Sequence, residues 1–138
     1  MSVFPLLNFW NSLLGFVINS VSSSPSPAFS FGKSPIAFCG FKAHSAPLGF
    51  EYMKNFADED IANSFLVCLH GSTKVSRQRG NAIVKITGAN NYTTVIDGFL
   101  TGKTAKDRHG RPCDILMNDA HSFFFTDDLN GVLYFVWK

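Results

Sequence analysis

The sequence predicts an all-β chain built from short, evenly spaced strands. Short apolar runs rich in Val, Ile, Thr, Phe or Tyr recur along it, as in strands. Clusters of Gly, Asn and Asp separate these runs, and no helical period is sustained. Such a pattern is typical of a sandwich, a barrel or a propeller, and periodicity does not choose among them. The runs are Phe65–Leu69, Ala82–Ile86, Thr93–Ile96, Ile115–Met117, Phe123–Thr126 and Val132–Val136.

Composition indicates one ordinary globular domain. The chain has 138 residues, of which 46% are apolar and 16% charged, enough to bury a core. The net charge of +2 is small, and seven of the twelve basic residues lie in two clusters, at 74–79 and 103–111, that we interpret as solvated loops. Nucleic acid is therefore not a predicted partner. Three cysteines without CxxC spacing do not predict a disulfide framework, and Cys68, inside an apolar run, is expected to be a small buried hydrophobe.

The first forty residues are predicted to be an apolar leader and a linker, separate from the folded region at 41–138. Residues 1–18 are apolar but interrupted by polar side chains, and they contain no Lys or Arg. This segment is a poor membrane span. It is either an atypical signal peptide, cleaved near Ser22–Ser24, or the remnant of an upstream strand or a broken reading frame. The Ser- and Pro-rich stretch Ser22–Pro27 is typical of a linker.

Two local signals refine the folded region. Asn130-Gly131, between two aromatic runs, is the strongest hairpin signal in the chain. The stretch Ala57–Asn63 is the one helical candidate, with Asp58, Glu59 and Asp60 placed for a first turn. We expect one or two turns there at most.

Several strings after Phe41 resemble the PQQ-dependent glucose/sorbosone dehydrogenase family. Residues 44–49 (H-S-A-P-L-G) are similar to its H-x-A-P-L-G segment, and the run at Phe65–Leu69 followed by H-G-S is similar to its F-V-A-x-H-G-S phrase. The strings G-F-L at 98–100, G-R-P-C-D-I at 110–115 and the acidic, aromatic segment 119–128 follow in the family's order. The chain departs from the family at Thr73-Lys74-Val75, where relatives have Trp-Asn-Arg. It departs again at Ala120, where a turn glycine is replaced at a cost if φ is positive there.

The resemblance implies a partial β-propeller of about two blades: one complete four-stranded blade and part of another. The family fold is a six-bladed propeller that holds pyrroloquinoline quinone (PQQ) and calcium and oxidises sugars or aldehydes. The blades that carry its catalytic histidine and calcium ligands have no counterpart here, so no catalytic residue is predicted. We expect a C-terminal fragment, inactive alone, periplasmic or secreted, whose unpaired blade faces could self-associate. The alternative is a non-catalytic β-repeat module acting by protein association, or a truncated product.

By the same resemblance, three residues are candidate cofactor ligands: Arg111, His70 and Lys74. A guanidinium suits a carboxylate of PQQ because its planar fork makes two parallel hydrogen bonds. Lys74 would add positive charge, whereas Cys113 stands where some relatives have a second arginine. The alternatives are structural: Arg111 caps a loop and pairs with Asp107 or Asp114, and His70 is a satisfied strand-end side chain.

No metal site is predicted. Asp119, Asp127 and Asp128 could suggest calcium, but they lack the dense oxygen-rich spacing of a calcium loop. An ordinary acidic turn explains them as well, and zinc-type Cys/His spacing does not occur.

Overall fold

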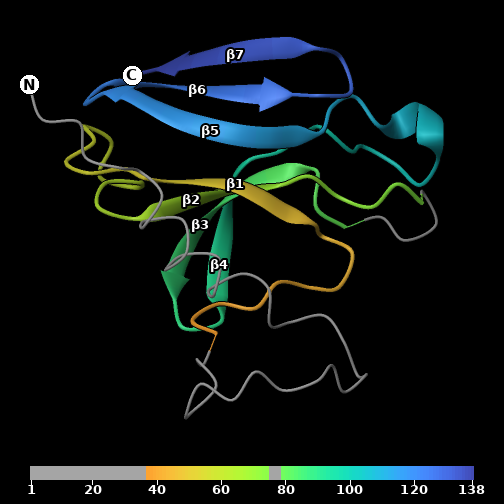
Figure 1. Cartoon of the computed structure of the whole chain (residues 1–138), viewed down its shortest axis with the longest axis horizontal. Coiled ribbons are helices and arrows are strands. Elements are labelled where there is room, and N and C mark those ends of the chain that lie inside the picture. Colours follow the sequence, from red (N-terminus) through yellow and green to blue (C-terminus); the bar gives the residue numbers. More distant parts are fainter. Residues whose placement is uncertain (1–36, 75–78) are drawn as a thin grey trace, which may run out of the picture.

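The computed structural model describes residues 37–74 and 79–138, which form two antiparallel sheets (Figure 1). The first sheet has four strands in sequence order and the second has three. The all-β prediction is confirmed. Within the described part of the chain, no helix has the length and apolar character needed to span a membrane. The strands are β1 (Pro47–Tyr52), β2 (Phe65–Leu69), β3 (Ala82–Gly88), β4 (Asn91–Ile96), β5 (Pro112–Asp119), β6 (Ser122–Asp127) and β7 (Val132–Trp137).

The predicted leader and linker at 1–40 fall almost wholly outside this description, because residues 1–36 are not described. At its end, Phe38 and Gly40 contact the β3–β4 turn. Asn90 donates its backbone N–H to the carbonyl of Phe38 at 3.0 Å, and its side-chain oxygen accepts from Gly40 N at 2.9 Å.

Each predicted apolar run lies within a strand, and the predicted bounds of β2 are those observed. Strand β1 has no continuous apolar run, because Gly49 and Glu51 interrupt it. The helical candidate Ala57–Asn63 forms one hydrogen-bonded turn, closed by Ala62 N donating to Asp58 O at 2.8 Å, and no helix. A short 3-10 turn at Ala105–Asp107 carries no sequence signal that we recognised.

The predicted hairpin at Asn130-Gly131 is confirmed. It joins β6 to β7, and Gly131 has a φ of 63°, which glycine adopts without steric cost. The ladder then runs one-to-one from Asp127 opposite Val132 to Ser122 opposite Trp137. At the preceding β5–β6 turn, Ala120 is not among the residues of positive φ, so an alanine causes no backbone strain there.

The main core lies between the two sheets. The run in β2 is buried on both faces: Leu66 and Cys68 join this core, while Val67 and Leu69 pack on the far face of the first sheet. This explains why the run is continuous rather than alternating. Burial raises the pKa of the Cys68 thiol to about 12, so the cysteine is a buried hydrophobe, as predicted. The core residues are Met53, Phe56, Ile61, Leu66, Cys68, Ile83, Phe99, Ile115, Phe123 and Phe125.

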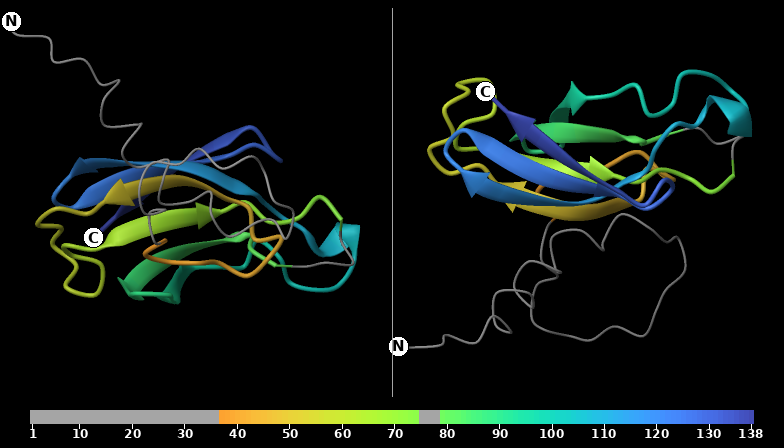
Figure 2. Two further views of the ribbon diagram at one scale, coloured as in Figure 1. Left: turned by 60° about the horizontal axis from the view of Figure 1, so that its bottom comes forward. Right: turned by 90° about the horizontal axis from the view of Figure 1, so that it is seen from above.

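The sheets come closest where β1 crosses β5, and Figure 2 shows the second sheet lying over β1 and β2. A Cβ on Gly49 would lie 2.5 Å from the Cα of Asp114 and 2.7 Å from the carbonyl oxygen of Cys113. Only a residue without a side chain permits this approach, so Gly49 sets the spacing of the two layers.

Candidate functional site

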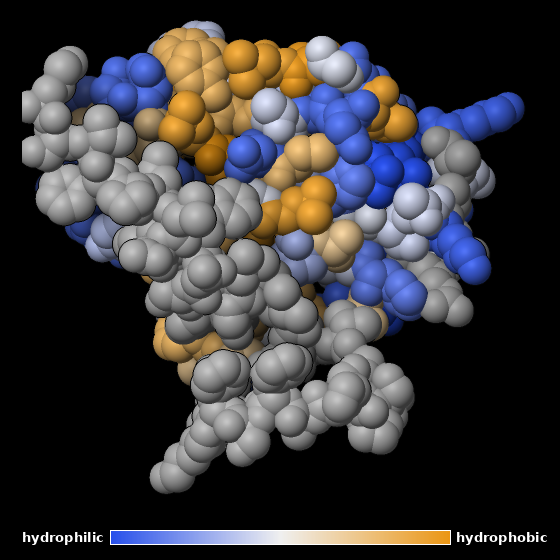
Figure 3. Space-filling model, in the orientation of Figure 1, coloured by the Kyte–Doolittle hydropathy of each residue, from blue (hydrophilic) through white to orange (hydrophobic). Residues whose placement is uncertain are grey.

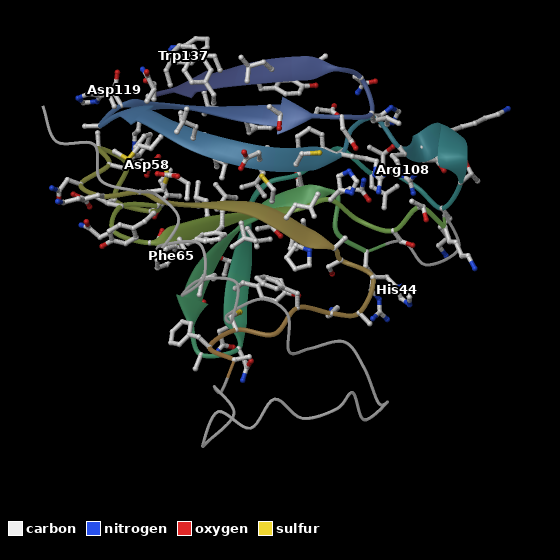
Figure 4. The ribbon with its side chains drawn as sticks, in the orientation of Figure 1. His44, Asp58, Phe65, Arg108, Asp119 and Trp137 are labelled. Carbon is white, nitrogen blue, oxygen red and sulfur yellow. The ribbon has the colours of Figure 1, made fainter. Side chains whose placement is uncertain are left out.

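Three strand ends meet at one end of the molecule. His70 follows β2, Arg111 precedes β5 and Asp128 follows β6. Because β5 and β6 are antiparallel, with Pro112 opposite Asp127, the start of one strand lies beside the end of the other. Figure 4 marks this end by Arg108, with Asp119 and Trp137 at the opposite end of the sheets.

His70 connects the other two residues through its two ring nitrogens. Its Nε2 lies 2.9 Å from Oδ1 of Asp128, and its Nδ1 lies 2.8 Å from Nη2 of Arg111. A guanidinium can only donate, so Nδ1 accepts and the ring proton is on Nε2, which donates to Asp128. With both nitrogens engaged and the side chain 12% exposed, His70 has no ring atom left for a ligand. His70 therefore matches the structural alternative to cofactor binding, in which it is a hydrogen-bonded side chain at the end of a strand.

Two of the three guanidinium nitrogens of Arg111 donate hydrogen bonds to the loop after β2. Nε donates to His70 O at 3.4 Å, and Nη2 donates to Gly71 O at 3.1 Å as well as to the ring. The pairing with Asp107 or Asp114 in the structural alternative is wrong, since Asp107 accepts from Thr104 N and Oγ1 at 2.7 and 2.8 Å, and Asp114 Oδ1 accepts from Ile115 N at 2.9 Å. Among the described residues, Nη1 has no partner, and it is not fully buried. One nitrogen therefore remains to meet an anion.

Arg108 is a second arginine at this end, and the sequence did not identify it. Its Nη2 donates to Ser72 O at 2.5 Å, and its Nε is buried without a hydrogen-bond partner among the described residues. The interpretation of 103–111 as a solvated loop is therefore wrong for Arg108 and Arg111. Two guanidiniums bind the carbonyls of residues 70–72. The sequence signal that could have identified this pair is that the two arginines are three residues apart and lie just before an apolar strand.

Lys74 ends the same described loop segment. Its backbone N–H donates to the Ser72 hydroxyl at 3.1 Å, and its side chain is exposed. It therefore adds an exposed positive charge after His70, Gly71 and Ser72. His44 is an exposed residue of the loop before β1, where it has a φ of 72° (Figure 4).

Asp127 is a structural carboxylate. It is 2% exposed, and its Oδ1 accepts from Arg111 N at 2.9 Å and Leu129 N at 3.0 Å. Its Oδ2 accepts from Nδ2 of Asn130 at 2.8 Å. These bonds use most of the four lone-pair directions of the carboxylate, and they connect it to the hairpin and to the start of β5. Asp127 fixes the backbone of Arg111 and favours the acidic-turn interpretation over calcium.

One further cluster offers metal-type ligands. Ligand atoms of His70, Cys113 and Asp128 lie within 4.8 Å of one another. The set does not suit calcium, which takes six or more oxygens. It also does not suit zinc as arranged, because Nε2 carries the proton and Nδ1 accepts from Arg111. Burial raises the pKa of the Cys113 thiol, which disfavours the thiolate that a metal needs.

The His70–Asp128 contact predicts an acid-sensitive contribution to stability. The hydrogen bond from His70 is the main cause that lowers the pKa of Asp128 below its ordinary value of 3.8. A depressed carboxyl pKa stabilises the fold above the unfolded-state pKa, and this contribution is lost as pH falls through the folded-state pKa. Asp128 is 51% exposed, so Asp128→Asn should cost less than about 1 kcal/mol at neutral pH. Urea unfolding between about pH 7 and about pH 3 should show the variant and parent converging. A difference that does not change with pH would contradict this role.

Comparison with known proteins shows one informative similarity. The chain is similar to an uncharacterized protein of Borreliella burgdorferi, with 38% identity over 103 residues. The similar region covers 69% of this chain and 26% of the relative, so the chain spans about a quarter of the length of the curated relative it matches. No protein-family model and no solved structure matches the chain.

Proposed function

We propose that this chain is the C-terminal part of a PQQ-dependent sugar dehydrogenase of the glucose/sorbosone type. Within a complete propeller it would belong to a periplasmic or secreted oxidoreductase acting on sugar CH–OH or aldehyde groups. Alone it would be inactive. The observation that carries the proposal is the convergence of the similar strings in space. His70 of the H-G-S string contacts Arg111 of the G-R-P string, 41 residues away, and Asp128 of the T-D-D string, 58 residues away.

The sheet arrangement supports a partial propeller. Each sheet is an antiparallel meander in sequence order, with four strands and then three. Their first strands, β1 and β5, lie against each other with the close approach at Gly49. In a propeller the first strands of successive blades are neighbours around the axis, and a four-stranded meander is one blade. On this basis the described residues would form one blade and three strands of the next.

The proposed contact with the cofactor uses one guanidinium nitrogen of Arg111 rather than two. PQQ carries carboxylates, and Nη1 of Arg111 is the nitrogen left to meet one. Lys74 would add a long-range attraction, while His70 orients the guanidinium rather than contacting the cofactor. Because Nε and Nη2 are held by the protein, a bidentate pair would require those bonds to break. We therefore expect weak binding of PQQ by the isolated chain.

A titration of the isolated chain with PQQ tests the proposal. Arg111→Ala should weaken binding by at least about tenfold, the usual scale of a charge-assisted contact, while Arg111→Lys should retain part of it. Lys103→Ala is the matched control for loss of one exposed positive charge in the same loop and should bind as the parent does. Circular dichroism checks that each variant is folded. Equal binding by the parent and Arg111→Ala would overturn the proposed site.

We also expect no dye-linked sugar oxidation by the isolated chain with PQQ and calcium supplied. Such activity would overturn the proposal that the chain carries an incomplete active site.

A non-catalytic module acting by protein association is the second candidate. Large apolar side chains exposed on the second sheet favour it. Leu116, Leu133, Phe135 and Trp137 are between 47% and 71% exposed, which is unusual for a soluble surface.

A further inference from the structure

The hydrogen bond between Arg111 and the ring of His70 requires a neutral ring. Nδ1 accepts from Nη2 of Arg111 at 2.8 Å, and Nε2 donates to Oδ1 of Asp128 at 2.9 Å. A protonated imidazole carries a hydrogen on both nitrogens and can only donate, as can a guanidinium. With a proton on Nδ1, two cationic donors would face each other at hydrogen-bond distance. One of the two side chains would then have to move.

The groups that face His70 favour movement of Arg111 rather than of the ring. Asp128 holds Nε2, and a carboxylate binds a charged ring more strongly than a neutral one. The hydrogen bond from His70 lowers the pKa of Asp128, so this carboxylate is ionised at neutral pH. Cys113 is the third facing group, with its sulfur within 4.8 Å of the ring, and burial raises the pKa of its thiol. Protonation of the ring therefore tightens the contact with Asp128 and repels Arg111.

Two further cations lie on the loop that follows His70. Arg108 donates to the carbonyl of Ser72, and Lys74 ends the described part of the loop. Neither is a partner of the ring, because Arg111 and Asp128 occupy its two nitrogens. Both add positive charge, which also disfavours a second cation beside a charged ring.

The remaining bonds of Arg111 allow its guanidinium to move while its backbone stays in place. Asp127 accepts from the backbone N–H of Arg111 at 2.9 Å, whereas Nε reaches His70 O only at 3.4 Å. Loss of the ring contact frees one hydrogen of Nη2 beside Nη1, which has no partner among the described residues. The surface at this end of the molecule is mostly hydrophilic, so an anion in solution can reach it (Figure 3). Two free terminal nitrogens suit a carboxylate, which they bind through parallel hydrogen bonds.

We propose that His70 is a positioning residue whose protonation releases Arg111 and raises the affinity of this site for a carboxylate ligand. With a neutral ring, Arg111 offers one nitrogen. With a charged ring, it offers two, and the ring adds a positive charge of its own. An imidazole changes charge between about pH 5 and about pH 8, whereas ordinary carboxylates stay ionised above about pH 4. The inference rests on the proposed function, because it takes the carboxylates of PQQ as the ligand, and it adds a pH dependence to their binding.

Titration of the full chain with PQQ at pH 8 and at pH 5, at one ionic strength, tests the proposal. The affinity of the parent should be at least about tenfold higher at pH 5, the scale of one additional charge-assisted hydrogen bond. His70→Gln should change by less than about twofold, because the glutamine side chain does not titrate although it can accept from Arg111 and donate to Asp128. Circular dichroism checks folding at both pH values. An unchanged affinity of the parent, or a rise that persists in His70→Gln, would overturn the proposal.

His109→Gln is the matched control. His109 is an exposed histidine of the loop before β5, and its Nε2 lies 3.0 Å from Oγ1 of Thr101 rather than beside Arg111. This variant removes one imidazole by the same chemical change and should keep the rise in affinity at pH 5. If His109→Gln removes the rise, a histidine other than His70 controls binding and the proposal is wrong.

Nuclear magnetic resonance of the free chain separates this inference from the cofactor assignment. As pH falls, the guanidinium signals of Arg111 should shift with the same midpoint as the ring signals of His70, and they should not shift in this way in His70→Gln. If PQQ binds at neither pH while these signals move together, the proposed cofactor is wrong and the release of Arg111 stands. Arg111 signals that do not follow His70 would overturn the release, whatever the affinity for PQQ.

Discussion

Replacing Gly49 with alanine should lower the free energy of unfolding by about 3 kcal/mol, because the new methyl group overlaps the backbone of the facing sheet. The Cβ would lie 2.5 Å from the Cα of Asp114 and 2.7 Å from Cys113 O. Both are main-chain atoms of β5, so relief requires moving one sheet against the other rather than rotating a side chain. Such a movement would open the core that contains Leu66 and Phe123.

Gly88→Ala is the matched control for this substitution. Gly88 ends β3, another strand of the first sheet, but a Cβ there meets nothing within 4 Å, and its φ is not positive. Gly88→Ala should change the free energy of unfolding by less than about 0.5 kcal/mol. Urea unfolding with both midpoints and slopes measures the two effects. If Gly49→Ala is as stable as Gly88→Ala, the sheets are not in close contact at β1 and β5.

The strands with apolar runs were predictable because burial determines which residue types they contain. β2 is buried on both faces and appears as a continuous apolar run, and the hairpin before β7 carries Asn130-Gly131. Strand β1 gives no such signal, because Gly49 is required by the facing backbone and Glu51 lies at a half-buried position. Where tertiary contact rather than local preference selects the residue, pattern analysis does not identify the strand.

The candidate site was predictable only in part. His70 and Arg111 were singled out from the family resemblance, but their direct contact depends on how the two sheets pack, over a separation of 41 residues. Spacing along the chain contains no information about such a contact. The same is true of Arg108, whose charge suggested solvent although its Nε is buried.

Asp127 had a usable signal. The alternation of β6 places Phe123 and Phe125 on the buried face, and continuing it by two residues places Asp127 there too. A carboxylate on a buried face must have hydrogen-bond partners, since an unpaired one is costly. Counting this period would have assigned Asp127 to the interior and Asp128 to the surface, which is the arrangement observed.

Asp127→Ala should therefore be among the most damaging substitutions in the chain, with a loss of about 3 to 4 kcal/mol. It removes the acceptor of two backbone N–H groups, at Arg111 and Leu129, and of the Asn130 side chain. Buried donors left without partners cost about 1 to 3 kcal/mol each, and part of this is recovered if water enters the turn. Asp127→Asn keeps one carbonyl oxygen for the two backbone donors but opposes its NH₂ to that of Asn130, so we expect a loss of about 1 to 2 kcal/mol.

The neighbouring Asp128→Asn provides the control, because it changes an exposed carboxylate of the same turn by the same chemical step. Urea unfolding should rank the losses as Asp127→Ala, then Asp127→Asn, then Asp128→Asn. Amide exchange gives an independent measurement, because the N–H groups of Arg111 and Leu129 should exchange faster in both Asp127 variants than in the parent, while the amide of Phe124, inside β6, should change only with global stability. If Asp127→Ala costs no more than Asp128→Asn, the Asp127 carboxylate does not hold the hairpin to the entry of β5. The backbone of Arg111 must then be fixed by the guanidinium contacts with His70 and Gly71 instead.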